Sequence, residues 1–411
     1  MKRILRHELV RRSALFSLSV LASTIVGVFS LPALIASIGA TQWGHLAVMQ
    51  AVSQFFAVIV AFGWGATGPS MVSALTPHAR KAVYVDSLRL RGVLLALAAP
   101  PTVLLCMWLP GETWTDAVLA TVSYTFAGLS AAWYFVGTNR PIALFLFDAL
   151  PAIVGQVIGL IAVLIFRDLT AYLACTALFT LVGVAASGLF VLTRESDGPA
   201  RSARPIPWRE IVRSQSAGVT STISASLWTA APTVLVQALA PAAVPVFAMI
   251  DRLMKYGVLA LAPILQAVQG WVPESGRGTV AARAVTALRV SVAVGLLGGV
   301  GLAALSTPVS AVLSVGQAIV PWGVAAIAGA AFAFECVAQI SGLSGLVALG
   351  GSRQLATSSV ASAVIGIPVI ALFVLWFGLY GAVLGILAVA AGLAIYRTRH
   401  VLRYAARATP A

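Results

Sequence analysis

Charged residues are scarce in this sequence. Only 9% of its 411 residues are Asp, Glu, Lys or Arg, whereas 60% are hydrophobic and the mean hydropathy is +0.98. A soluble domain usually has about a quarter of its residues charged, because charge covers its surface. The composition therefore excludes a soluble globular protein and indicates a chain that lies mostly within a membrane.

Cysteine is rare as well. Cys106, Cys175 and Cys336 fall in apolar runs, and their spacing fits neither a disulfide framework nor a metal site. We interpret them as small packing residues. There is no glycine-rich phosphate loop beside a strand–helix pattern, so ATP is not expected to act directly. We expect no catalytic residue, no metal and no cofactor, with coupling to H⁺ or Na⁺ left open.

What the sequence has is a series of long apolar runs. A helix of about 20 apolar residues crosses roughly 30 Å of hydrocarbon. Barrel strands would alternate with a period of two, and these runs do not. The sequence predicts an all-α polytopic membrane protein with about twelve transmembrane helices. The predicted spans cover residues 14–37, 43–65, 90–109, 115–137, 142–166, 170–193, 214–238, 242–270, 285–306, 317–349, 356–377 and 379–397.

The basic residues fall at alternate connections between these runs. Of the 26 Lys and Arg, 23 belong to one side of the predicted helix array, and only Arg167 belongs to the other. The positive-inside rule then predicts a bacterial cell membrane protein with both termini in the cytoplasm. The net charge is +14, but its spread over separate loops argues against nucleic acid as a partner.

The chain divides into two similar halves. A polar cytoplasmic linker, 194–213, separates an N-lobe of six spans (1–193) from a C-lobe of six spans and a cytoplasmic tail (214–411). With an offset of 200 residues, 31–50 weakly matches 231–250. Both halves begin in the cytoplasm, so they are expected to form a parallel pseudo-repeat. In such transporters the binding site lies between the repeats near the membrane midplane.

One predicted span has charge in its interior. The stretch AMIDRLMKYG places Asp251, Arg252 and Lys255 on one side of a helix, and Asp251 precedes Lys255 by the four residues that favour an ion pair. Each such charge at the centre of a membrane helix costs about 2.5–3.5 kcal/mol. We predict that Arg252 and Lys255 bind an anionic cargo. A salt bridge that locks this helix to a neighbour is the alternative.

Two acidic residues lie inside other spans. Glu335 and Asp148 are candidates for H⁺ or Na⁺ coupling, or for balancing the charge of Arg252. Structural pairing is the alternative for both, and Asp148 lies close enough to the cytoplasmic end to be an interfacial carboxylate.

Three uncharged residues complete the candidate site. Gln50 and Gln54 share one helix face and are expected to point inward, unless they bond to neighbouring helices. Trp228 is a candidate for stacking on a sugar ring, with packing as the alternative.

Four local patterns, taken in order, resemble bacterial polysaccharide flippases. They are a Leu-Pro span with a Gly turn and a Phe-Gly ending (31–66), an aromatic-rich turn, WYFVGTNRP (133–141), a span with basic residues closed by Pro (244–274), and the loop LVALGGSRQ (346–354). The resemblance implies membership of the multidrug/oligosaccharidyl-lipid/polysaccharide (MOP) exporter superfamily. It also implies a twelve-helix, two-lobe, V-shaped carrier similar to multidrug exporters of the MATE family.

That resemblance implies a function. Such a carrier flips undecaprenyl-diphosphate-linked oligosaccharide to the outer leaflet by alternating access. Its expected partners are the lipid bilayer and polysaccharide assembly proteins. Lipid II flippases also have cavity arginines in their first lobe, and the first two spans here have none beyond Arg12, which argues against lipid II. A MATE-like cation-coupled exporter is one alternative. A membrane-embedded glycan polymerase or glycosyltransferase is another, disfavoured because the longest predicted outward loop, 307–316, has no charge.

Overall fold

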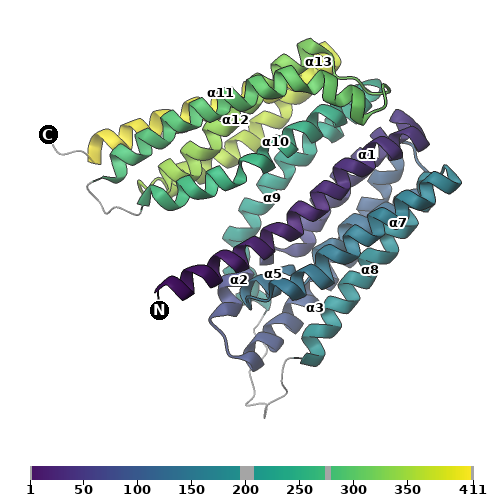
Figure 1. Cartoon of the computed structure of the whole chain (residues 1–411), viewed down its shortest axis with the longest axis horizontal. Coiled ribbons are helices and arrows are strands. Elements are labelled where there is room, and N and C mark those ends of the chain that lie inside the picture. Colours follow the sequence, from purple (N-terminus) through teal and green to yellow (C-terminus); the bar gives the residue numbers. More distant parts are fainter. Residues whose placement is uncertain (1, 195–207, 274–278, 409–411) are drawn as a thin grey trace. The chain divides into compact units, whose positions relative to one another are not determined.

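The computed structural model describes residues 2–194, 208–273 and 279–408, and all regular elements within them are helices (Figure 1). The chain forms two compact units, Met1–Ser226 and Leu227–Ala411, which we call the N-lobe and the C-lobe. The division falls inside helix α9 (Trp208–Leu239). Most of the predicted linker, at 195–207, lies outside the described residues.

The predicted number of spans agrees with the helices. In the described part of the chain, nine helical stretches are long and apolar enough to cross a membrane. Two of them, Ala22–Ser73 and Ser352–Arg407, contain a helix break and each correspond to two predicted spans. Helix α10 (Val244–Trp271) is long enough to cross a membrane but contains three charged residues, so it is not among these nine. With α10 counted, the helices match the twelve predicted spans. The V-shaped arrangement of the lobes stays a prediction.

Glycine marks the breaks between paired spans. Helix α1 (Lys2–Ala61) bends at Gly39, where φ is 84°, and α13 (Ser352–Ala408) bends at Gly378, where φ is 54°. Glycine adopts positive φ readily because it has no Cβ. The break in the C-lobe that corresponds to Gly39 is at Ala240, between α9 and α10. The offset of 200 residues therefore aligns the two breaks to within one residue.

The N-lobe differs from the sequence prediction at two places. A short helix, α2 (Trp64–Ser73), follows α1, and α3 (Pro77–Trp108) begins well before the predicted start at residue 90. The fourth span, predicted at 115–137, matches the helical stretch Trp114–Gly137, but it is not one regular α-helix. It consists of α4 (Trp114–Ala120), the π-helix η1 (Thr121–Thr125), the 3₁₀ helix η2 (Phe126–Leu129) and α5 (Ala132–Gly137).

The last two spans of the N-lobe are more regular. Helices α7 (Leu150–Phe166) and α8 (Leu169–Arg194) lie side by side (Figure 1). They pack through a glycine, since a methyl group on Gly155 would lie 2.8 Å from Cβ of Phe179. Before α7 the chain forms α6 (Pro141–Leu144) and the π-helix η3 (Phe145–Ala149).

The C-lobe is built around a close helix pair. Helices α11 (Val280–Leu313) and α12 (Trp322–Ile340) cross where a methyl group on Gly299 would lie 2.5 Å from the carbonyl oxygen of Gly329. Small residues permit such an approach, which is typical of helix packing in membranes. Because α11 extends to Leu313, most of the predicted outward loop is helical. A π-helix, η6 (Ser341–Leu346), follows α12.

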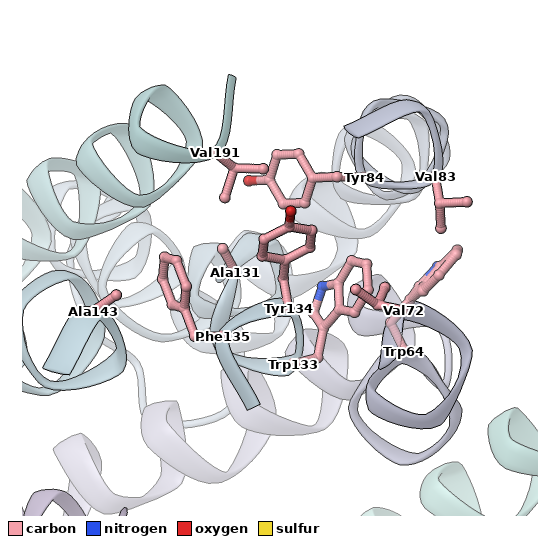
Figure 2. Close-up of a cluster of buried hydrophobic side chains, with 10 residues drawn as sticks. All are labelled: Trp64, Val72, Val83, Tyr84, Ala131, Trp133, Tyr134, Phe135, Ala143 and Val191. Carbon is pink, nitrogen blue, oxygen red and sulfur yellow. The ribbon is translucent and has the colours of Figure 1, made fainter. Parts of the chain in front are cut away.

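An aromatic cluster forms part of the N-lobe core (Figure 2). The rings of Trp64 and Trp133 are 4.7 Å apart, and Tyr84 packs against Trp133 and Tyr134. Phe135 extends the cluster toward α8. The motif WYFVGTNRP thus supplies three consecutive buried rings to this core, and aromatic pairs of this kind add about 0.5–1.5 kcal/mol beyond their burial.

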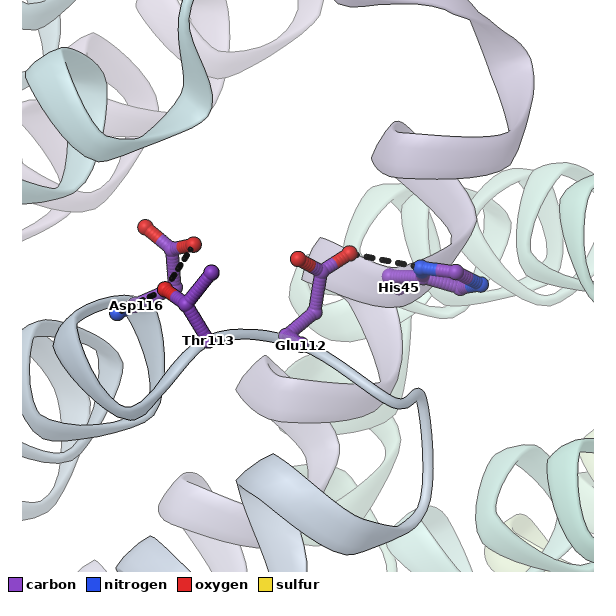
Figure 3. A network of polar contacts seen from close by, with 4 residues as sticks. All are labelled: His45, Glu112, Thr113 and Asp116. Carbon is purple, nitrogen blue, oxygen red and sulfur yellow. Dashed lines mark hydrogen bonds and ion pairs between the residues drawn. The ribbon is translucent and has the colours of Figure 1, made fainter.

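A polar network ties together the N-lobe connections near α4 (Figure 3). His45 Nδ1 on α1 lies 2.7 Å from Glu112 Oε1 in the loop before α4. The hydroxyl of Thr113 caps α4 by accepting a hydrogen bond from the backbone N–H of Asp116. The carboxylate of Asp116 in turn accepts a hydrogen bond from the hydroxyl of Thr170 on α8. These bonds hold α1, α4 and α8 together.

Candidate functional site in the C-lobe

Four helices of the C-lobe enclose a cavity of about 190 Å³. Such a volume holds several water molecules. Its wall contains charged, polar and apolar side chains from α9, α10, α12 and α13. They are Trp228, Thr229, Pro232, Asp251, Met254, Lys255, Val258, Glu335, Gln339 and Ile386.

Helix α10 contributes the first charged pair. Asp251, Lys255 and Val258 lie on one face because they are separated by four and three residues. Lys255 Nζ is 2.6 Å from Asp251 Oδ2, the ion pair predicted from their spacing, and 3.4 Å from the carbonyl oxygen of Thr229. Arg252 is about 100° further round the helix. It is half-buried and is not among the residues that line the cavity.

Helix α12 contributes the second polar pair. Gln339 Nε2 donates a hydrogen bond of 3.0 Å to Glu335 Oε1, one helical turn away. The sequence analysis missed Gln339, although its four-residue spacing from Glu335 places both on one face. The cavity wall therefore contains two carboxylates and one ammonium group. An excess of basic over acidic groups was expected from α10 alone, and α12 changes this balance by adding Glu335.

Helix α9 contributes an aromatic wall. Pro232 lies inside the helix and lacks the N–H that would bond to the carbonyl oxygen of Trp228. The ring of Trp228 packs against α13, since a methyl group on Gly366 would lie 2.8 Å from its Cζ3 atom. Trp228 therefore lines the cavity and also packs against α13, and its stacking on a sugar ring stays a prediction.

The remaining candidates belong to the N-lobe. Gln50 Nε2 donates a hydrogen bond of 2.9 Å to the hydroxyl of Tyr124 in η1, while Gln54, one turn further along α1, is exposed. The hydroxyl of Ser130 donates to the carboxylate of Asp148 in η3. Gln50 and Asp148 thus each have a polar contact within the helices of their own lobe.

The three cysteines lie in the described part of the chain. Cys106 and Cys336 are buried, Cys175 is half-buried, and all three are free thiols. Within the described ranges, no three His, Cys, Asp or Glu side chains are gathered in a way that fits a metal ion.

Sequence analysis missed the role of Arg91 in the N-lobe. Arg91 is one of the 23 Lys and Arg that the charge distribution assigns to the cytoplasmic side. Its side chain on α3, however, is only 1% exposed. It donates hydrogen bonds of 3.2 and 2.9 Å to the carbonyl oxygens of Gly128 and Ser130, where the fourth span is broken. A broken membrane helix needs such donors, because lipid supplies none.

Arg397 has a comparable environment in the C-lobe. Its side chain on α13 is 6% exposed and donates a 2.9 Å bond to the carbonyl oxygen of Ala338, just before η6. Two further bonds go to the hydroxyls of Ser358 and Ser359. Such a contact has no local signal, because Arg397 and Ala338 are 59 residues apart.

These features define a polytopic helical protein with the two-lobe fold of MOP superfamily transporters. The structure resembles that of the lipid II flippase MurJ in an inward closed conformation, with a TM-score of 0.76 and 12% sequence identity, covering 96% of this chain and 90% of that chain. It also resembles an inward-facing multidrug-resistance MATE transporter, with a TM-score of 0.66 and 14% identity over 94% and 95% of the two chains.

A third similar structure is a MOP superfamily transporter from Pyrococcus furiosus, with a TM-score of 0.53, 13% identity, and coverage of 97% of this chain and 94% of that chain. No protein-family model and no curated protein sequence matches the chain. At these identities the likeness establishes the fold alone. It agrees with the two-lobe helical fold expected from the sequence.

Proposed function

We propose that this protein is a flippase that moves undecaprenyl-diphosphate-linked oligosaccharide from the cytoplasmic to the outer leaflet by alternating access. The observation that carries the proposal is the charged cavity in the C-lobe, inside helices that cross the membrane. Charge at that depth costs several kcal/mol unless it is solvated or paired. A hydrated cavity that receives a polar head group gives those charges a function.

The residues have distinct proposed roles. Lys255 exchanges its bond to Asp251 for a bond to the diphosphate, and Arg252, on the adjacent face of α10, adds a guanidinium that suits paired phosphate oxygens. Gln50, Gln54 and Trp228 contact the sugars. Asp251, Glu335 and Asp148 balance charge or take up H⁺ or Na⁺ during the cycle. Polysaccharide assembly proteins are proposed partners on the product side.

A second candidate is a cation-coupled exporter of drugs or metabolites. It is favoured by the two carboxylates that line the cavity beside a single ammonium group, and the MATE fold is shared as well. The solved structures that resemble this chain are transporters, which supports a carrier over a membrane-embedded polymerase or glycosyltransferase.

The test measures surface glycan in a bacterial strain that lacks its own flippase, together with transport by purified protein in proteoliposomes. Arg252→Ala and Lys255→Ala should each stop export while the protein remains folded, and Arg252→Lys should recover only part of the activity. Glu335→Gln should slow transport and change its pH dependence. Arg289→Ala, at an exposed position on α11, is the matched control and should transport normally.

Normal glycan export by both Arg252→Ala and Lys255→Ala would place the anion site elsewhere. If the wild-type protein moves no lipid-linked glycan but exports organic cations against an ion gradient, the second candidate is correct. Unchanged pH dependence in Glu335→Gln would remove Glu335 from the coupling role.

We propose cytoplasmic termini in a bacterial cell membrane on the basis of the Lys and Arg distribution. Reporter fusions at residues 113 and 200 should report opposite sides of the membrane. The same side at both positions would contradict this orientation.

A further inference from the structure

A shallow apolar groove adjoins the charged cavity. It lies between α10, α11 and α12, and its walls include Leu261 and Ile264 on α10, Val294 on α11 and Cys336 on α12. Two residues, Val258 and Gln339, line both the groove and the charged cavity. The groove and the cavity therefore adjoin along α10.

The sequence explains why the groove begins where it does. The ring of Phe332 on α12 is inserted between two glycines, because a methyl group on Gly257 would lie 2.8 Å from it and one on Gly298 would lie 2.6 Å from it. This ring separates α10 from α11 at that level. Two residues that line the groove follow directly from this packing. Val258 is next to Gly257 in the sequence, and Cys336 is one turn beyond Phe332.

The two adjoining spaces, which lie at the two ends of one stretch of α10, differ in polarity. At one end Lys255, Asp251 and Glu335 present charge. At the other end aliphatic side chains predominate, and Ile264 is 39% exposed on the surface of a helix that spans the membrane. A charged cavity beside an apolar groove is complementary to an amphiphile.

We infer that this groove receives the polyprenyl chain of a lipid-linked cargo whose diphosphate lies in the charged cavity. The inference rests on the proposed flippase function and names the place of the lipid tail. The groove has a volume of about 20 Å³, against about 190 Å³ for the cavity. It therefore contacts one edge of the chain near the head group, while the rest of the chain remains in the bilayer.

The polar residue at the junction is consistent with this assignment. Gln339 is held by its hydrogen bond to Glu335, so its amide is engaged by the charged cavity. Branched aliphatic side chains begin beyond it. A branched isoprenoid chain fits such a surface through dispersion contacts, each weak but numerous.

The experiment uses a polyprenyl diphosphate with a diazirine in its first isoprene units, added to the purified full-length protein in nanodiscs. The probe should label the segments of α10, α11 and α12 that line the groove, as located by mass spectrometry of the cross-linked peptides. Leu261→Trp should reduce labelling at least tenfold. Ile264→Trp, at a partly exposed position that tolerates a larger ring, should reduce it several-fold.

The matched control is Leu297→Trp on α11, because Leu297 is 76% exposed and lies one turn from Val294 without lining the groove. It should label like the wild type. Thermal unfolding of each variant shows whether it is folded. Unlabelled polyprenyl diphosphate should compete with the probe, and phosphatidylglycerol at the same concentration should not.

The outcomes separate this inference from the proposed function. Equal competition by phosphatidylglycerol, or labelling confined to other helices, overturns the groove assignment even if glycan transport is normal. Groove labelling that depends on Leu261 supports the assignment, even if transport assays show a different glycan or another amphiphile as cargo.

Discussion

Each lobe buries one arginine beside a distorted helix, and the two arginines differ in the helix that supplies them. In the N-lobe, Arg91 comes from the third span and bonds to carbonyl oxygens of the fourth. In the C-lobe, Arg397 comes from the sixth span and bonds to Ala338 of the fourth. Both fourth spans contain a π-helix, η1 and η6.

This difference shows what the fold requires. A distorted helix in a membrane leaves carbonyl oxygens that need donors, and arginine offers five N–H groups at the end of a long side chain. Either neighbouring helix can supply it. The requirement therefore belongs to the distortion in the fourth span and not to a particular position in the sequence.

A second difference separates the lobes. In the register of the internal repeat, Asp251 and Lys255 correspond to Ala51 and Phe55. The N-lobe folds with apolar residues where the C-lobe has an ion pair. The fold therefore does not require this pair, which supports a functional role for it in the C-lobe.

The largest expected effect comes from removing the two arginines. Arg91→Ala removes a donor from the carbonyl oxygens of Gly128 and Ser130, and each carbonyl left unsatisfied costs about 1–3 kcal/mol. Arg397→Ala removes a donor from only one carbonyl oxygen, that of Ala338. The hydroxyl of Ser359, its other kind of partner, already donates to the carbonyl oxygen of Leu355 in the same helix. We expect Arg91→Ala to lower the unfolding free energy about twice as much as Arg397→Ala.

Thermal and denaturant unfolding of the purified variants checks this order. Arg89→Ala is the control for the N-lobe, because its side chain is 73% exposed. Equal losses for Arg91→Ala and Arg397→Ala would show that the number of carbonyl partners is not what matters.

A smaller effect tests the contact of Arg397 directly. A methyl group on Gly342 would lie 2.9 Å from Nη1 of Arg397, whose guanidinium is held by three bonds. Gly342→Ala should therefore destabilise the C-lobe by about 1–2 kcal/mol. Gly392→Ala on α13 is the matched control, because a methyl group there meets nothing within 4 Å.

A double-mutant cycle sharpens that test. With Arg397→Ala already present, Gly342→Ala should cost clearly less, because the guanidinium is gone and the added methyl group crowds Cδ1 of Leu355, also at 2.9 Å, instead of both. Strict additivity of the two changes would mean that the guanidinium does not oppose the added methyl group.

The smallest effect is expected at the polar network of the N-lobe. His45→Gln should change stability by about 1 kcal/mol or less, because it alters one hydrogen bond between partly buried side chains. Asp116→Asn should cost more, since the buried Asp116 carboxylate joins α4 to α8 through Thr113 and Thr170. The reverse order, measured by thermal unfolding, would contradict this assignment.

The sequence by itself determined the membrane class, the helical fold and the number of spans. These follow from local physics, because each span needs its own apolar length and bonds its own backbone. The ion pair of Asp251 and Lys255 was also readable, since both residues lie on one helix one turn apart.

Only the tertiary structure decided which residues share a site. Glu335 and Trp228 join Lys255 because three helices converge, while Arg252 does not line that cavity. The roles of Arg91 and Arg397 depend on carbonyl oxygens 37 to 59 residues away in the chain. Contacts between helices depend on how the helices cross, and hydropathy along one chain does not contain that information.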